Sequence, residues 1–439
     1  MSGEKMVSLY EPHTTNKKMR SRRKRILFFV CFFSILLLQT NVVLGQQKTE
    51  KLDLSQLHAL SAVLMDGHSG RILFEKNGYE ILPMASTTKI MTCILALEHG
   101  NLDDMLTVSS YAASMPQVRL GVHVGERYRL KNLLYSLMLE SHNDSAVVIA
   151  EGIAGSVEAF AEMMNQKARD IGAYDTFFVT PNGLDATAMC QTENGRAEEK
   201  AHSTTAADLA RILRYCVVES PQRELFLQIT QADSHQFMDG EGRRTFGCYN
   251  HNAFLDMMEG ALTGKTGFTG KAGYCYVGAV EQGEELYIVS LLACGWPNNK
   301  SYKWSDMRKL VTYGLDTYEY RNVWQDISPT QIPVLDGIPQ DGSPDGQAHV
   351  AVKVDPKSLE GNGPELSVLL REDEQVRIRV DVEDSLSAPV RPGTIVGTVT
   401  YLLEEDIVGT YNLITTESVE LRDLTWYLQY IWDIFLVSD

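Results

Sequence analysis

The sequence predicts an α+β protein: an antiparallel sheet with helices on its faces, then a small β-sandwich and a C-terminal amphipathic helix. Three observations support this prediction. Strand-like runs occur in pairs joined by short polar turns, which is typical of hairpins. Helical patterns lie between these hairpins without strict alternation with single strands, which favours an antiparallel sheet. A stretch rich in Pro, Gly and Asp at 328–348 precedes short alternating strands.

Length and composition are those of a globular protein. The chain has 439 residues, of which 44% are hydrophobic and 22% charged, and this excludes a disordered or collagen-like chain. The length predicts two or three domains. The formal net charge of −17 opposes nonspecific binding to nucleic acid, so we expect no nucleic-acid partner.

The first 45 residues have the layout of an export signal. They carry eight Lys or Arg and two Glu, a net charge of +6, which leaves −23 for the remainder. A basic run at 17–25 precedes the apolar run 26–38, and Val43-Leu44-Gly45 provides compact residues for cleavage. The apolar run is short for a spanning helix, although an uncleaved anchor is the alternative. Met19 is an alternative start.

The main domain, 46–325, is expected to contain two hairpins and a buried helix. The segments 62–65 and 71–74 flank a turn-rich stretch, and strands at 273–280 and 286–294 flank a polar turn. A helix from Ser86 to Leu97 is apolar nearly all round, so we expect it to be central and buried. Residues 130–220 predict helices that alternate with loops.

The β-sandwich is predicted at 326–418. Valine and isoleucine alternate with polar residues at 350–354 and 376–382, and short strands continue over 395–415. In the last segment, 419–439, apolar residues recur at helical spacing among Trp and Tyr, which suits a membrane interface. Its last 19 residues, 421–439, have three acidic residues and one basic residue, Arg422, so an anionic bilayer would not attract it electrostatically. A helix docked on the β-domain is the alternative.

The cysteines predict buried small side chains. Six of the seven lie after the export signal, widely spaced and without a CxxC pair, so we do not expect a disulfide framework. The chain also lacks an HExxH motif or paired CxxC motifs, so we expect no metal site.

The first chemical motif is Ser86-Thr87-Thr88-Lys89. Residues i and i+3 of a helix face the same side, so the Lys89 amine can reach the Ser86 hydroxyl. Burial lowers the pKa of a lysine amine, which can then act as a base. The spacing alone is weak, because it recurs at Ser2–Lys5 and Ser21–Lys24, and Ser86 could simply cap the helix beside a surface Lys89.

The second motif is Ser141-His142-Asn143, between apolar helical stretches at 133–139 and 146–153. A loop serine and asparagine there could relay a proton and hold a substrate amide. The alternative is that Asn143 or Asp144 caps the following helix. We expect His142 to point to solvent, the alternative being that it tunes Ser141.

The third motif, Lys265-Thr266-Gly267, occurs once and precedes the second hairpin. Its glycine would let a ligand backbone approach the sheet edge. A simple turn lysine is the alternative. We do not expect a phosphate-binding loop, because three residues rather than four separate Gly260 from Gly264, and turn and strand follow instead of a helix.

In this order, the three motifs form the active-serine signature of penicillin-binding proteins and β-lactamases. The chain resembles the low-molecular-mass penicillin-binding proteins that are serine-type D-alanyl-D-alanine carboxypeptidases, of the peptidase S11 type. The resemblance in sequence covers about residues 55–320. The β-domain and the last helix resemble this family only in their order along the chain. The flanking segments that also carry it are Pro83–Thr92, Asn182-Gly183-Leu184, His202-Ser203-Thr204 and Lys265–Tyr274.

The resemblance implies a two-step acyl transfer on a peptidoglycan stem peptide that ends in D-Ala-D-Ala. Ser86 would attack the penultimate carbonyl and Lys89 would take its proton. Ser141 and Lys265 would relay a proton to the leaving nitrogen, while the backbone N–H groups of Ser86 and Phe268 would hold the oxyanion. The implied substrate-binding residues are Asn143, Lys265, Thr266, Gly267, Phe268 and, in place of an arginine of some relatives, Lys300.

The resemblance also implies inhibitors, a location and no cofactor. Penicillin would acylate Ser86 by the same route, so we expect β-lactams to inhibit. The absence of a nearby Glu-x-x-Leu-Asn argues against efficient β-lactamase activity. A D,D-transpeptidase or endopeptidase and a wall protein that binds β-lactams without turnover are the alternatives. The expected location is outside the bacterial cytoplasmic membrane or in the cell wall, with the last helix as a candidate membrane contact.

Overall fold

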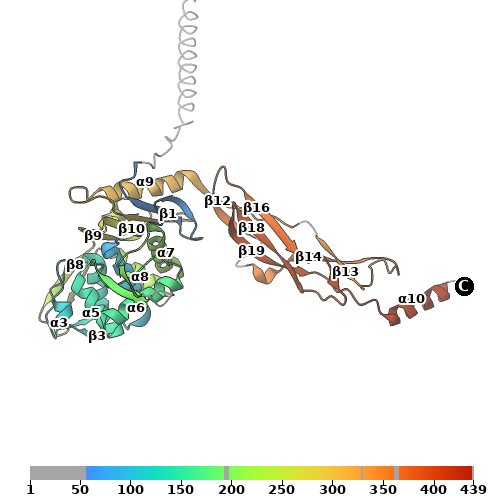
Figure 1. Cartoon of the computed structure of the whole chain (residues 1–439), viewed down its shortest axis with the longest axis horizontal. Coiled ribbons are helices and arrows are strands. Elements are labelled where there is room, and N and C mark those ends of the chain that lie inside the picture. Colours follow the sequence, from blue (N-terminus) through green and yellow to red (C-terminus); the bar gives the residue numbers. More distant parts are fainter. Residues whose placement is uncertain (1–55, 192–196, 328–329, 360–364, 438–439) are drawn as a thin grey trace, which may run out of the picture. The chain divides into compact units, whose positions relative to one another are not determined.

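The computed structural model describes residues 56–191, 197–327, 330–359 and 365–437 (Figure 1). The predicted export signal at 1–45, with Cys31, lies outside the described residues.

A five-stranded antiparallel sheet, in the order β2-β1-β11-β10-β9, organises the first part of the chain. Its strands are β1 (Ser61–Asp66), β2 (Ile72–Lys76), β9 (Ala261–Thr269), β10 (Gly273–Gln282) and β11 (Glu285–Leu292). Both predicted hairpins are confirmed, because β1 pairs with β2 and β10 pairs with β11. Strand β9, which carries the third motif, lies at one edge of this sheet.

The two faces of this sheet are covered by different helices. In β10, Val277 joins the core on one side, whereas Tyr276 packs on Trp304 of α9 (Tyr302–Thr317), with 4.9 Å between ring centroids. Helix α7 (Ala206–Arg214) contacts strands β1, β10 and β11 of this sheet. Figure 1 shows the sheet between α9 and a helical layer that contains α7. The predicted α+β class is confirmed.

The helical layer surrounds α2 (Lys89–His99), which begins directly after the 3₁₀ helix η2 (Ala85–Thr88). Every residue from Lys89 to Leu97 is buried, which confirms the central helix predicted from its apolar sequence. The other helices of this layer are α3 (Ser110–Ala113), α4 (Leu130–Tyr135), the π-helix η3 (Ser136–Glu140), α5 (Asn143–Ala154), α6 (Val157–Asp170), the π-helix η4 (Tyr215–Glu219) and α8 (Arg223–Gln231). The 3₁₀ helix η5 (Ala253–Asp256) packs on α9 instead, where Phe254 stacks on Trp304.

The prediction of helices and loops alone over 130–220 is wrong at one place, where β5 (Thr187–Gln191) pairs with β6 (Ala197–Ala201). Four of the five β6 residues are exposed, so the strand lacks the apolar alternation on which a prediction depends. Two further antiparallel pairs join β3 (Met105–Thr107) to β4 (Arg127–Arg129) and β7 (Ser234–Met238) to β8 (Thr245–Tyr249).

The second part of the chain is built mainly of strands. It contains a six-stranded sheet in the order β16-β18-β19-β14-β13-β17 and a two-stranded sheet of β12 and β15. The strands are β12 (Tyr318–Asn322), β13 (Gln331–Leu335), β14 (Ala348–Val354), β15 (Ser367–Arg371), β16 (Val376–Val382), β17 (Leu386–Ser387), β18 (Ile395–Leu403) and β19 (Asp406–Thr415), with the 3₁₀ helix η6 (Pro356–Ser358). These strands enclose a core of their own, with Val350, Val399 and Leu413 fully buried. The predicted β-domain is confirmed, whereas its exact boundaries stay predictions.

The predicted C-terminal helix is present as α10 (Leu424–Val437). Its apolar side chains face solvent, and Leu424 and Phe435 are each 74% exposed. The alternative of a helix docked through these side chains on the β-domain is therefore not seen. No helix among the described residues combines the length and apolar character needed to cross a membrane.

The cysteines are largely as predicted. All six described cysteines are free thiols; five are buried, and Cys190 is partly exposed. The five buried thiols are Cys93, Cys216, Cys248, Cys275 and Cys294. Among the described residues, no three His, Cys, Asp or Glu side chains form a group that could hold a metal ion.

Candidate active site

Ser86 and Lys89 meet at the start of the central helix. Ser86 lies in η2 and Lys89 opens α2, one turn later. The Lys89 ammonium donates to Ser86 Oγ at 2.8 Å, to Asn143 Oδ1 at 3.0 Å and to the Asn182 carbonyl at 2.5 Å. Lys89 is 0% exposed, so the alternative of a surface lysine beside a capping serine is wrong.

The surroundings of Lys89 suit a base. Burial, followed by the positive charge of Lys265, lowers the pKa of Lys89 well below its usual value, and Asp144 opposes this effect. A neutral amine has two N–H donors and one lone pair. The oxygens of Asn143 and Asn182 can only accept, so they would take the two donors. The lone pair is then left to accept the hydroxyl proton of Ser86.

Ser141 and Lys265 form the second contact pair of the site. Ser141 follows the π-helix η3 in the left-handed conformation, with φ of 64°. Lys265, on β9, donates to Ser141 Oγ at 2.9 Å and to the Thr266 carbonyl at 3.0 Å. Burial lowers the pKa of Lys265 to about 7. Near neutral pH this amine can therefore exchange a proton with the Ser141 hydroxyl.

Asn143 and Asp144 hold the site and its surrounding loop together. Asn143 accepts from Lys89 and donates through Nδ2 to the Pro116 carbonyl at 3.3 Å. The buried Asp144 carboxylate accepts the backbone N–H groups of Leu120 and Gly121 at 2.9 and 2.7 Å. The alternative in which either side chain merely caps α5 is therefore wrong.

The expectation that His142 points to solvent is also wrong. Its side chain is buried, and Nδ1 lies 2.8 Å from the hydroxyl of Ser136, which also contacts the Ser145 hydroxyl at 2.7 Å. Burial lowers the pKa of His142. The ring turns inward because Ser136 of the preceding π-helix and Ser145 of α5 together supply a polar site for it.

The third motif lies on an edge strand beside Ser86. A Cβ added to Gly267 would lie 3.0 Å from the Ser86 backbone nitrogen and from the Met84 carbonyl oxygen. Glycine therefore permits the close approach of β9 to η2. Because β9 pairs with β10 only on one side, its other edge can accept an added peptide strand. The turn-lysine and phosphate-loop alternatives fail, because residues 261–269 form a strand.

The remaining predicted residues are placed less tightly. Thr266 lies on β9 beside Lys265, and Phe268 packs on Tyr274 with 4.7 Å between ring centroids while remaining 42% exposed. Lys300 lies in the loop between β11 and α9 with an exposed side chain. No described hydrogen bond joins its ammonium to the other predicted residues, so its role stays a prediction.

Two functional positions in the loop Asn182-Gly183 are additional to the predicted set. Asn182 contributes its backbone carbonyl to Lys89, and Gly183 adopts φ of 84° against Ala85. A Cβ at Gly183 would lie 2.0 Å from the Ala85 carbonyl oxygen. The resemblance marked this segment, but a role that belongs to backbone atoms leaves no signal in side-chain chemistry.

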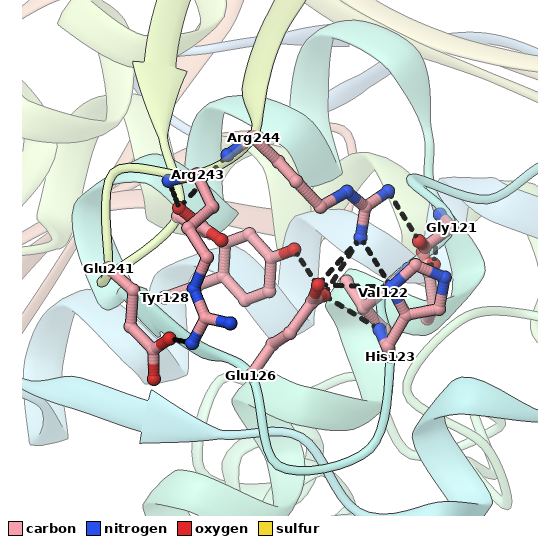
Figure 2. Close-up of polar contacts among 10 residues, drawn as sticks. Gly121, Val122, His123, Glu126, Tyr128, Glu241, Arg243 and Arg244 are labelled. Carbon is pink, nitrogen blue, oxygen red and sulfur yellow. Dashed lines mark hydrogen bonds and ion pairs between the residues drawn. The ribbon is translucent and has the colours of Figure 1, made fainter.

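A cluster of polar side chains contacts the loop around Gly121, whose backbone N–H donates to Asp144. Arg244 donates to the Glu126 carboxylate at 2.8 Å and to the Gly121 carbonyl at 2.9 Å, and Tyr128 donates to Glu126 at 2.7 Å (Figure 2). Burial opposes ionisation of Glu126, but hydrogen bonds from His123, Tyr128 and Arg244 prevail and lower its pKa to about 2. No sequence signal joins Glu126 to Arg244, because the two residues are 118 positions apart.

Comparison with known proteins gives matches over both parts of the chain. A family model described as D-alanyl-D-alanine carboxypeptidase, peptidase S11, matches residues 46–293. A model of the C-terminal domain of penicillin-binding protein 5 matches residues 366–421. The first match spans Ser86, Ser141 and Lys265.

Individual relatives agree with these models. The chain is 26% identical over 383 residues to the D-alanyl-D-alanine carboxypeptidase DacF of Bacillus subtilis, covering 84% of this chain and 88% of that protein. It is 30% identical over 259 residues to a D-alanyl-D-alanine endopeptidase of Pseudomonas aeruginosa, covering 58% and 78%. The crystal structure of penicillin-binding protein 5 from Haemophilus influenzae has a TM-score of 0.61 at 24% identity, covers 83% of this chain and 98% of its own, and shows the fold.

Proposed function

The chain belongs to the D-alanyl-D-alanine carboxypeptidase family, peptidase S11, and we propose that Ser86 is its nucleophile. The members of this family are serine hydrolases. The substrate is a peptidoglycan stem peptide that ends in D-Ala-D-Ala. The observation that carries the proposal is the buried Lys89 amine, which contacts Ser86 Oγ and two oxygens that can only accept. This arrangement supplies a base directly beside the attacking hydroxyl.

The acylation step follows from these contacts. Ser86 Oγ forms a bond to the carbonyl carbon of the penultimate D-Ala, and its proton passes to Lys89. The C–N bond to the terminal D-Ala then breaks, and the leaving nitrogen receives a proton through Ser141 and Lys265, whose side chains are 2.9 Å apart. In the second step water attacks the ester carbonyl, which frees the shortened peptide and restores the Ser86 hydroxyl.

The substrate is proposed to lie along β9. The backbone N–H groups of Ser86 and Phe268 would bind the oxyanion, and the close approach of Gly267 to the Ser86 amide supports this pairing. Asn143 would hold the substrate amide. Lys265 and Thr266 would bind the terminal carboxylate, with Lys300 as a further cation at the rim. β-Lactams would acylate Ser86 by the same path.

Product analysis tests this function. We expect the purified chain to release free D-alanine from a soluble stem pentapeptide, as measured by mass spectrometry of the products. An endopeptidase would instead cleave the cross-bridge of a dimeric muropeptide, an activity that the Pseudomonas relative makes the second candidate. A transpeptidase would form a new cross-link in the presence of an acceptor peptide. Release of no D-alanine, with or without a stable penicillin adduct, would contradict the proposal.

We also propose that the chain is exported and acts at the outer face of the cytoplasmic membrane, with α10 in contact with the bilayer. The basic and apolar pattern of residues 1–45 supports export. The exposed apolar side chains of α10, such as Leu428, Ile431 and Phe435, support burial in a lipid interface. The single basic residue nearby, Arg422, indicates apolar rather than electrostatic attraction.

Vesicle binding tests the proposed role of α10. We expect the chain from residue 46 onward to sediment with neutral phosphatidylcholine vesicles at least as well as with anionic ones, because apolar burial supplies the attraction. A variant carrying Ile431→Asp and Phe435→Asp should remain in the supernatant while releasing D-alanine from soluble pentapeptide at the normal rate. Equal sedimentation of the variant would contradict the assignment.

A further inference from the structure

Two residues beside the site have no role in the steps above: Thr88 of the first motif and His202 of the segment His202-Ser203-Thr204. Both side chains are buried, at 1% and 3% exposure. His202 Nε2 lies 2.7 Å from Thr88 Oγ1, and Thr88 Oγ1 donates to the Ala85 carbonyl at 2.8 Å. A buried chain of hydrogen bonds therefore ends on the residue that precedes Ser86.

The hydrogen-bond partners fix the direction of this chain. Nδ1 of His202 accepts the backbone N–H groups of Val179 and Thr180, at 3.0 and 3.3 Å, so it carries no proton. The proton of the neutral ring is then on Nε2, which donates to Thr88 Oγ1. Burial and, second, the charge of Lys89 lower the pKa of His202 to about 3, which keeps the ring neutral.

The Ala85 carbonyl needs such support. Ala85 adopts φ of 51°, in the left-handed region that costs a residue with a Cβ about 1–2 kcal/mol relative to its ordinary conformation. Gly183 packs against the same carbonyl from the other loop, so closely that a Cβ there would lie 2.0 Å from the oxygen. A strained conformation of this kind persists only where its surroundings hold it.

The carbonyl of Ala85 and the N–H of Ser86 belong to one peptide group. Because that group is planar and trans, the two bonds point in opposite directions, and fixing the oxygen also fixes the N–H. We propose that Thr88 and His202 are positioning residues that aim the Ser86 N–H at the oxyanion, through their hydrogen bonds to the Ala85 carbonyl. This inference rests on the proposed function of Ser86.

The neighbouring residue Thr87 provides a matched control. It lies on the same 3₁₀ helix, is also 1% exposed, and donates to the Met84 carbonyl at 2.6 Å. Thr87→Val and Thr88→Val therefore each remove one buried hydroxyl and one bond to a carbonyl three residues earlier. Only Thr88→Val releases the carbonyl whose peptide group carries the Ser86 N–H.

The experiment measures penicillin acylation in the purified chain, separating noncovalent affinity from the acylation rate constant. We expect Thr88→Val to lower the rate constant by about tenfold to 10²-fold, since loss of one oxyanion donor costs about 10²–10³ and small misplacements cost up to about 10². Its noncovalent affinity should stay within about twofold of wild type. Thr88→Ser should restore most of the rate, and Thr87→Val should stay within a few-fold of wild type.

Three results would overturn the inference. One is a rate constant for Thr88→Val no lower than that of Thr87→Val, and another is a failure of Thr88→Ser to recover activity. The third requires no variant: nitrogen NMR of wild-type His202 should show a protonated Nε2 and an unprotonated Nδ1, and the opposite tautomer would exclude the chain of bonds. Failure of the wild-type chain to acylate would overturn the proposed function itself, and this inference with it.

Discussion

Replacing Lys89 by methionine is expected to lower the acylation rate of Ser86 by about 10²- to 10⁴-fold, the usual contribution of a positioned general base. Methionine keeps the length and apolar body of the side chain, so the packing of α2 is largely retained. It removes the amine that lies 2.8 Å from Ser86 Oγ. The hydroxyl proton of Ser86 then loses the amine in direct contact with it, since the other amine of the site, Lys265, contacts Ser141 instead.

The rate of penicillin acylation, followed by intact mass, checks this prediction. Lys303→Met is the matched control, because Lys303 is another buried lysine, 2% exposed, whose pKa burial lowers to about 8. Its ammonium donates to the Lys300 carbonyl at 2.7 Å, outside the Ser86 pair. We expect this variant to acylate within a few-fold of wild type. Retention of more than one tenth of the wild-type rate by Lys89→Met would exclude Lys89 as the base.

Replacing Gly183 by alanine is expected to destabilise the protein and to disable the site together. At φ of 84°, any residue with a Cβ is strained by about 1–2 kcal/mol. The added Cβ would also lie 2.0 Å from the carbonyl oxygen of Ala85 and 2.4 Å from its carbon, so the backbone before Ser86 must move. Overpacking of this kind adds about 1–3 kcal/mol, and the displaced Ser86 should acylate at least tenfold more slowly.

Gly155→Ala separates the two contributions. Gly155 ends α5 with φ of 82°, and nothing lies within 4 Å of the position of its Cβ. Urea denaturation should therefore give a loss of only about 1–2 kcal/mol for Gly155→Ala, with acylation unchanged. A loss for Gly183→Ala equal to that of Gly155→Ala, together with normal acylation, would show that contact with Ala85 does not position the nucleophile.

Local sequence patterns predicted the two hairpins and the central helix, because these elements form between residues close in sequence. The hairpins at 61–76 and 273–294 were recoverable because apolar runs flank polar turns, and the buried helix at 89–97 because nearly every side chain is apolar. The contact of Ser86 with Lys89 follows from their spacing within one motif. The contact of Ser141 with Lys265 joins two motifs 124 positions apart, so it was expected from the resemblance and not from local spacing.

The features that the sequence did not predict depend on distant or backbone partners. His142 turns inward because Ser136 and Ser145 meet around it, which no local pattern indicates. The Asn182 carbonyl serves Lys89 through an atom that every residue possesses. The exposed hairpin of β5 and β6 buries too little to leave an apolar alternation in the sequence.

The mass of the peptide that contains Ser86, after reaction with penicillin, tests the proposed nucleophile directly. We expect one covalent adduct, located on Ser86, in the wild-type chain. We expect no adduct and no release of D-alanine from stem pentapeptide in Ser86→Ala. An adduct mapped to another residue, or D-alanine released by Ser86→Ala at the wild-type rate, would exclude Ser86 as the nucleophile.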